Sequence, residues 1–143
     1  MDNNALITLI GKHTIDGEAD SFELTTSGKY MKQNGKYFVS YEGSELTGYD
    51  DTTTTLKIKD DYVSMIRFGK KMGSSQMIFE ENKQYTGVYR TPCGNMSVDV
   101  YTNEMEVNLN DDGGEVELDY YVQLNSCEPV RNNLKVKIRK VEE

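Results

Sequence analysis

The sequence predicts an all-β fold, a closed antiparallel meander β-barrel of about 8–10 strands. Three observations predict it. Apolar and polar residues alternate with a period of about two along most of the chain. Turn-forming residues recur at intervals of about ten residues. No window of helical length keeps a helical period. A meander of this kind can close on itself, which removes exposed sheet edges.

Alternating runs follow one another along the chain. In KYFVSYE, residues 36–42, Tyr37 and Tyr41 share a face, and in TLKIKD, residues 55–60, apolar residues alternate with lysines. We expect each run to be a half-buried strand. The later runs place these groups of residues on one face: Met96, Val98 and Val100; Met105, Val107 and Leu109; Val116, Leu118, Tyr120, Val122 and Leu124; Leu134, Val136 and Ile138.

Turn signals separate these runs. Glycine and asparagine supply the positive φ that tight hairpin turns need. The predicted turns are Asn34-Gly35, Gly43-Ser44, Asp60-Asp61, Gly73-Ser74-Ser75, Asn82-Lys83, Pro92-Cys93-Gly94-Asn95 and Asp111-Asp112-Gly113-Gly114.

The segment around Pro92 raises the question of whether Cys93 is reactive or lies in a chain reversal. Proline cannot donate to a strand ladder, and Gly94 can take a left-handed conformation. The segment therefore predicts a corner between strands at 85–91 and 96–102, with Cys93 at its tip.

The last predicted hairpin carries opposite charges on its outward faces. Acidic residues alternate along one strand and basic residues along the next, and such cross-strand pairs attract weakly. They are Glu115, Glu117 and Asp119, followed by Lys135, Lys137 and Arg139.

The length and charge limit the classes of function. The 143 residues suit one core, so we expect residues 1–143 to form a single β-barrel domain. A net charge of −8 repels phosphate backbones, which argues against a nucleic-acid partner. The N-terminal segment has no basic region before its interrupted apolar stretch, so we expect a cytoplasmic protein without a membrane partner.

Several kinds of chemistry lack their usual residues. The single histidine, His13, argues against a zinc site, and the paired aspartates do not follow calcium-loop spacing. The two cysteines, Cys93 and Cys127, are expected to stay reduced. No phosphate-binding glycine loop or nucleophile motif is present. We therefore expect no cofactor, no metal and no enzymatic activity.

Five short motifs occur in order along the chain: SYEG at 40–43, MIRFG at 65–69, MIFE at 77–80, GVYRTPCG at 87–94 and ELDYYVQL at 117–124. In combination they resemble the DUF1934 family. The resemblance covers nearly the whole chain. It implies a calycin-like, lipocalin-type β-barrel of small bacterial proteins with no established activity, and it supplies no catalytic residues.

The candidate binding residues are one arginine and five tyrosines. Arg67 lies in the apolar run YVSMIRFG, where a guanidinium beside a closed lumen could clamp an anion. Alternatively, it caps one barrel end. The tyrosines either line a pocket for a small amphipathic ligand or fill the barrel. They are Tyr37, Tyr41, Tyr85, Tyr89 and Tyr120.

Two functions remain open, and an enzyme is the least favoured third. The first is a non-enzymatic binding module for a small amphipathic or anionic molecule in the barrel. The second is a filled barrel whose outer wall or rim docks another protein or a second copy, so we expect either a monomer or a homodimer.

Overall fold

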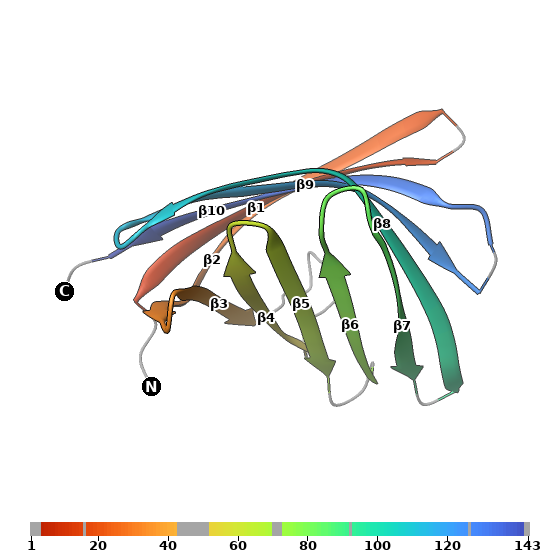
Figure 1. Cartoon of the computed structure of the whole chain (residues 1–143), viewed down its shortest axis with the longest axis horizontal. Helices are drawn as coiled ribbons and strands as arrows, with labels where there is room; N and C mark the ends of the chain where they lie inside the picture. Colours follow the sequence, from red (N-terminus) through yellow and green to blue (C-terminus); the bar gives the residue numbers. More distant parts are fainter. Residues whose placement is uncertain are drawn as a thin grey trace.

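The computed structural model describes residues 4–15, 17–42, 52–69, 73–91, 93–125 and 127–141. Their backbone forms ten β-strands (Figure 1). The strands are β1 (Ala5–Ile15), β2 (Glu18–Gln33), β3 (Lys36–Glu42), β4 (Thr52–Lys59), β5 (Tyr62–Gly69), β6 (Gly73–Phe79), β7 (Gln84–Thr91), β8 (Gly94–Asn110), β9 (Gly113–Leu124) and β10 (Val130–Lys140). Among the described residues, no helix has the length and apolar character needed to cross a membrane.

The strands form a closed barrel in the order β1-β10-β9-β8-β7-β6-β5-β4-β3-β2, and β1 pairs with both β2 and β10. Each neighbouring pair is antiparallel, as in a meander whose first and last strands meet. This confirms the predicted all-β closed barrel.

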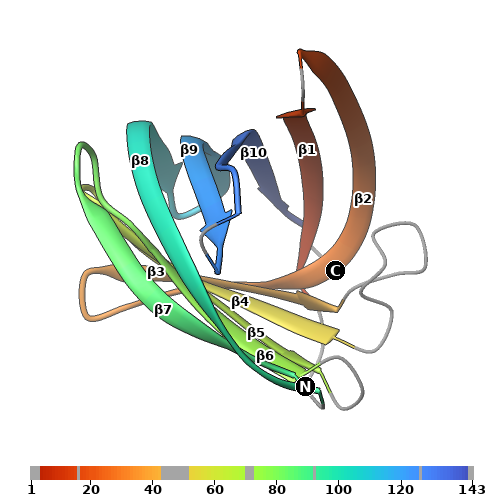
Figure 2. The ribbon, with the colours of Figure 1, turned by 90° about the vertical axis from the view of Figure 1, so that its right-hand side faces the viewer.

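The barrel is flattened into two crossing layers. The long strands β1, β2, β8, β9 and β10 curve over one side, and the shorter strands β3 to β7 cross beneath them (Figures 1 and 2). Strand length follows this division, since β8 has 17 residues and β4 has 8.

Alternation of side chains places the core inside the barrel. Along β4, the even-numbered residues from Thr52 to Ile58 are buried, whereas Lys59 is exposed. Along β9, Val116, Leu118 and Tyr120 are buried in the same way. The buried apolar core is Ala5, Ile7, Leu9, Tyr30, Val39, Tyr41, Leu56, Ile58, Val63, Met65, Phe79, Val98, Val100, Val116, Leu118, Tyr120, Leu134, Val136 and Ile138.

Two predicted boundaries differ from the structure. The predicted turn at Gly73–Ser75 is wrong, because β6 begins at Gly73, which pairs with Gly69 of β5. The runs starting at Met96 and Met105 belong to one strand, β8, in which a bulge between Thr102 and Glu104 shifts the register. A bulge inserts one unpaired residue, and this explains why the sequence alternation changes phase there.

The turns at Asn34-Gly35, Asp60-Asp61 and Asn82 lie where the sequence predicts them. The predicted corner also lies between β7 and β8, with Cys93 exposed at its turn, although Pro92 is outside the described residues. The predicted turn at 43–44 lies outside them too.

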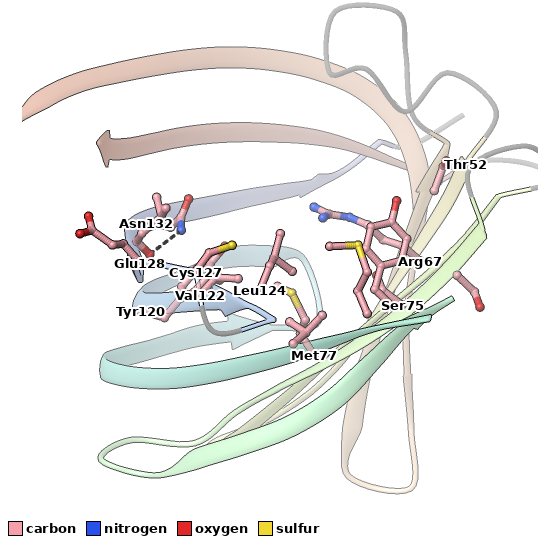
Figure 3. Close-up of a pocket in the computed structure, with 15 residues that line it drawn as sticks. Thr52, Arg67, Ser75, Met77, Tyr120, Val122, Leu124, Cys127, Glu128 and Asn132 are labelled. Atoms are coloured by element: carbon pink, nitrogen blue, oxygen red, sulfur yellow. Dashed lines mark hydrogen bonds between the residues drawn. The ribbon is translucent and has the colours of Figure 1, made fainter. Parts of the chain in front are cut away.

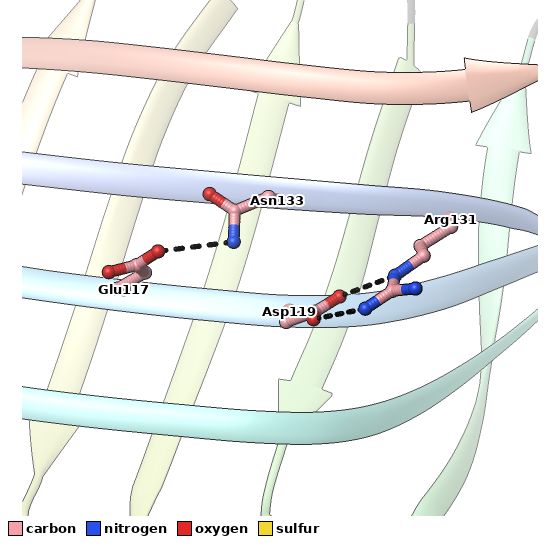
Figure 4. A network of polar contacts seen from close by, with 4 residues as sticks. All are labelled: Glu117, Asp119, Arg131 and Asn133. Atoms are coloured by element: carbon pink, nitrogen blue, oxygen red, sulfur yellow. Dashed lines mark hydrogen bonds and ion pairs between the residues drawn. The ribbon is translucent and has the colours of Figure 1, made fainter. Parts of the chain in front are cut away.

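The predicted charge pairing between β9 and β10 is present on the outer wall. Lys135 Nζ lies 4.0 Å from Glu117 Oε1, and Lys137 Nζ lies 3.9 Å from Glu115 Oε1. Asp119 is held by Arg131 rather than by Arg139. The Arg131 guanidinium donates to both carboxylate oxygens, at 3.1 and 2.8 Å (Figure 4). The hydrogen bonds from Arg131 hold the pKa of Asp119 below its ordinary value.

The junction between β6 and β7 has the shortest ladder of the barrel described here. Its pairing covers Ser74↔Arg90 and Ser75↔Tyr89, whereas the other ladders contain six or more residue pairs. The two strands nevertheless approach closely at Gly87, where a β-carbon would lie 2.8 Å from the carbonyl oxygen of Gln76. A larger residue at Gly87 would therefore push the two strands apart.

Candidate functional site

One end of the barrel is filled by side chains. Tyr30 is fully buried, and its ring stacks on Tyr37 with centroids 5.6 Å apart and planes at 5°. The Tyr30 hydroxyl donates a 2.6 Å hydrogen bond to the carbonyl oxygen of Asn110. The stacked aromatic rings fill this part of the barrel, and the Tyr30 hydroxyl is satisfied within the protein. Tyr37 is therefore a packing residue.

The other half of the barrel contains a cavity of about 440 Å³. Arg67 on β5 lies in its wall, and its guanidinium extends into the cavity (Figure 3). Its orientation follows from the pleat. Val63 and Met65 on the same face are buried, whereas the neighbouring Ile66 and Phe68 are 42% and 63% exposed on the outer face.

Strand register explains why the polar residues gather around Arg67. Tyr41, Thr54 and Arg67 are successive partners across β3, β4 and β5. The row continues through Ser75 on β6 to Tyr89 on β7. Directly paired residues on one face lie side by side, so these five form one polar layer of the inner wall.

The remaining wall of this cavity is mainly apolar. The apolar side chains come from β6 and β8 to β10, and they are Met77, Met96, Val98, Val122, Leu124 and Val130. Thr52 is buried at the opposite side, and its Oγ1 has no hydrogen-bond partner among the described residues. The charged residues in the lining are Arg67 and the exposed Glu128, which lie across the cavity from each other (Figure 3).

A second cavity of about 430 Å³ adjoins the first. Both are lined by Arg67, Tyr120 and Asn132. Tyr120 also packs edge-on against Phe79, with ring centroids 4.7 Å apart, so it lies between the cavities and the filled core. The second cavity is more polar, because it is also lined by Lys12, His13, Asp20, Tyr41, Thr54 and Asn133.

Tyr85 belongs to a separate polar cluster. Its hydroxyl donates a 2.9 Å hydrogen bond to Glu80 Oε1, and Lys83 forms an ion pair with the same carboxylate. Hydrogen bonds from Lys83 and then from Tyr85 lower the pKa of Glu80. The cluster closes the turn between β6 and β7, and Tyr85 lines neither cavity beside Arg67.

The structure thus brings together four of the six predicted site residues: Arg67, Tyr41, Tyr89 and Tyr120. The predictions for Tyr37 and Tyr85 do not fit this arrangement. Sequence analysis also missed Thr52, Thr54 and Asn132. The two threonines continue the alternation of Leu56 and Ile58 on β4, a signal that would have placed them on the inner face.

The reactive residue types lie at the rim or outside. His13 Nε2 is 3.7 Å from Asp20 Oδ2 near the end of the β1–β2 hairpin. Cys93 and Cys127 are both exposed and are not joined to each other. Over the described ranges, no three His, Cys, Asp or Glu side chains are grouped so that they could hold a metal ion.

This arrangement places a guanidinium beside an apolar wall and several hydroxyl groups. A planar guanidinium can donate two parallel hydrogen bonds to a carboxylate or phosphate group. The apolar wall can then bury a hydrocarbon body, and the tyrosines and Thr52 offer hydroxyls for orientation.

Comparison with known proteins gives a family and a fold. The family described as "Domain of unknown function (DUF1934)" matches residues 7–136. Among solved structures, the chain is similar to the crystal structure of the ywiB protein from Bacillus subtilis, with 17% identity and a TM-score of 0.83. That match covers 98% of this chain and 93% of the other, and it shows the shared fold alone. No curated protein matches the sequence.

Proposed function

Because the chain belongs to the DUF1934 family, whose description assigns no activity, we propose a function from the barrel itself: a non-enzymatic binding module for a small amphipathic anion. The observation that carries the proposal is Arg67. A guanidinium extends from the inner wall into a cavity of about 440 Å³ whose lining is mostly apolar. Arg67 is half-buried, so its stem packs in the wall while its guanidinium stays accessible from the cavity.

The size and chemistry of the cavity agree with such a ligand. Small-molecule sites are typically about 300–1,000 Å³, mainly apolar, and equipped with a few polar groups that fix orientation. Arg67 would hold the anionic group, and Met77, Val122 and Leu124 would contact the apolar body. Tyr89 and Thr52 would offer hydrogen bonds beside it.

The experiment is fluorescence titration of the purified protein with a dansyl-labelled medium-chain fatty acid. We expect saturable binding by the wild type and about tenfold to hundredfold weaker binding by Arg67→Gln, because a charge-assisted bidentate hydrogen bond is lost. Arg139→Gln is the matched control, since it removes an exposed arginine at the end of β10, outside both cavities.

Two results would contradict the proposal. One is the absence of saturable binding by the wild type. The other is equal affinity of wild type and Arg67→Gln, which would place the probe elsewhere on the protein. Thermal unfolding of each variant establishes that a loss of binding is not a loss of fold.

A second candidate function is docking through the outer wall. Ile66, Phe68 and Val88 are 42%, 63% and 45% exposed on the outer face of β5 and β7. Exposed apolar groups gathered on one face are typical of contact surfaces. Sedimentation equilibrium of the wild type and of Phe68→Ser tests this candidate. A dimer weakened by the substitution would support it, and a monomer at all concentrations would contradict self-association.

A further inference from the structure

We infer that the ligand of the barrel carries its negative charge between two unlike arms, as a phosphodiester with one alkyl arm and one hydroxylated arm does. The inference rests on the proposed function and names the class of ligand that the site would take. It follows from the position of Arg67 between two cavities of different character.

The two cavities adjoin at a common set of residues. Cavities of about 440 and 430 Å³ share Arg67, Tyr120 and Asn132 in their linings. An anion held by Arg67 therefore has unfilled space on two sides. A ligand whose charge lies at the end of a single chain would fill one cavity and leave the other empty.

The linings of the two cavities suit different chemistry. On one side, Met77, Val98 and Leu124 present an apolar wall that matches a hydrocarbon arm. On the other side, Tyr41 and Thr54 present hydroxyl groups. These side chains can donate to and accept from alcohol groups of a ligand.

The charge pattern restricts the second arm further. Lys12 and Asp20 line the polar cavity with opposite charges, and Asp20 is 82% exposed, beside His13. Because these two charges oppose each other, this lining favours neither a cationic group nor a second anionic group on the ligand. The second arm is therefore uncharged and hydroxylated. A phosphodiester fits this description, because it has one negative charge, two oxygens for the guanidinium fork and two ester arms.

Isothermal titration calorimetry with two synthetic esters tests the inference. The probes are dodecyl glyceryl phosphate and dodecyl methyl phosphate, both used below their micelle concentrations. They have the same alkyl arm and the same charge, and they differ in the hydroxylated arm. We expect the glyceryl ester to bind about tenfold more tightly, as two net hydrogen bonds would provide.

Two substitutions locate the hydroxylated arm. Thr54→Val removes a hydroxyl from the polar cavity with little change of shape, and Tyr41→Phe does the same. Each should weaken the glyceryl ester about threefold or more and leave the methyl ester unchanged. The matched control, Thr55→Val, changes the next residue of β4, whose side chain is on the other face of the strand.

The outcomes separate this inference from the proposed function. If both esters bind with equal affinity through Arg67, the two-armed ligand is wrong and the binding module stands. If the glyceryl ester is preferred but Thr54→Val and Tyr41→Phe do not reduce the preference, the assignment of its arm to the polar cavity is wrong. If neither ester binds and the dansyl fatty acid also fails to bind, both proposals fail.

Discussion

Replacing Tyr30 with phenylalanine tests how the filled end of the barrel is stabilised. The Tyr30 side chain is 1% exposed, and its hydroxyl donates to the carbonyl oxygen of Asn110 at 2.6 Å. Phenylalanine keeps the ring stacked on Tyr37 but leaves the carbonyl oxygen of Asn110, in a part-buried position, without this donor. We therefore expect Tyr30→Phe to lower the free energy of unfolding by about 1–2 kcal/mol at neutral pH.

The same hydroxyl group predicts that the wild type loses folding stability at high pH. Burial, followed by the influence of Tyr37 and Asp111, raises the pKa of Tyr30 well above its ordinary value of 10.0. Below that value the folded and unfolded states both keep the proton, so the full stabilisation is present. Above it the unfolded state loses the proton and the folded state keeps it, and stability falls by about 1.4 kcal/mol per pH unit.

Near pH 11, the stability that the wild type loses through ionisation should equal the stability that Tyr30→Phe loses with its hydrogen bond. At about that pH the wild type has lost about 1.4 kcal/mol through Tyr30, a loss that Tyr30→Phe does not suffer. The difference in free energy of unfolding between the wild type and Tyr30→Phe, present at neutral pH, should therefore shrink to nearly zero. Urea denaturation followed by circular dichroism at about pH 7, 9 and 11 measures this, with Tyr101→Phe as the control that removes a more exposed phenol. A constant difference between wild type and Tyr30→Phe across the pH range would refute the reasoning.

Three further predictions concern the fold. Gly114→Ala should lower the free energy of unfolding, measured by urea denaturation, by about 3 kcal/mol, because φ is +137° and the new methyl group would collide with a carbonyl oxygen of β8. Its control, Gly17→Ala, has a φ of +80° in open space and should lower it by about 1 kcal/mol. Arg131→Gln should destabilise the barrel at neutral pH, because Asp119 loses its hydrogen-bond donor. The difference in stability from wild type should disappear as the pH falls through the lowered pKa of Asp119, because the folded state then also takes up the proton. A difference that persists in acid would contradict this account. Leu118→Ala should lower the free energy of unfolding by about 2–5 kcal/mol, since the side chain is 1% exposed, and a smaller loss would mean that the barrel collapses around the deleted atoms.

Much of the fold was predictable because alternation and turns act locally. Residues that alternate along β9 and β10 do so because one face meets the core and the other meets water. The β1 strand is less evident in sequence, since Leu6 and Ile10 on the outer face are apolar like Ile7 and Leu9 on the inner face. The bulge in β8 depends on its pairing with β9, which no local pattern reveals.

The site was predictable in residue type but not in arrangement. Both faces of β5 carry apolar residues, so the sequence could not decide whether Arg67 points inward; the packing of the whole barrel decides it. Tyr37 and Tyr89 lie on equivalent alternating positions, yet one stacks on Tyr30 and the other faces a cavity. That difference depends on the shift of each strand along the barrel axis relative to its neighbours. This shift is set by the whole closed sheet and not by any one strand.

The short ladder between β6 and β7 has a consequence for hydrogen exchange and association. Gln76–Phe79 pair with β5 and Gln84–Val88 pair with β8, but the edges of these two segments that face each other lie outside the described pairing. The amides on those facing edges should therefore exchange with deuterated water before those of the other junctions. Unpaired strand margins usually attract strands from other molecules. At Gly87 the two strands are already so close that a β-carbon would touch Gln76, so an added strand, which needs about 4.8 Å on each side, has no room at that position. We therefore expect water to reach this junction, while the contact at Gly87 blocks a foreign strand there.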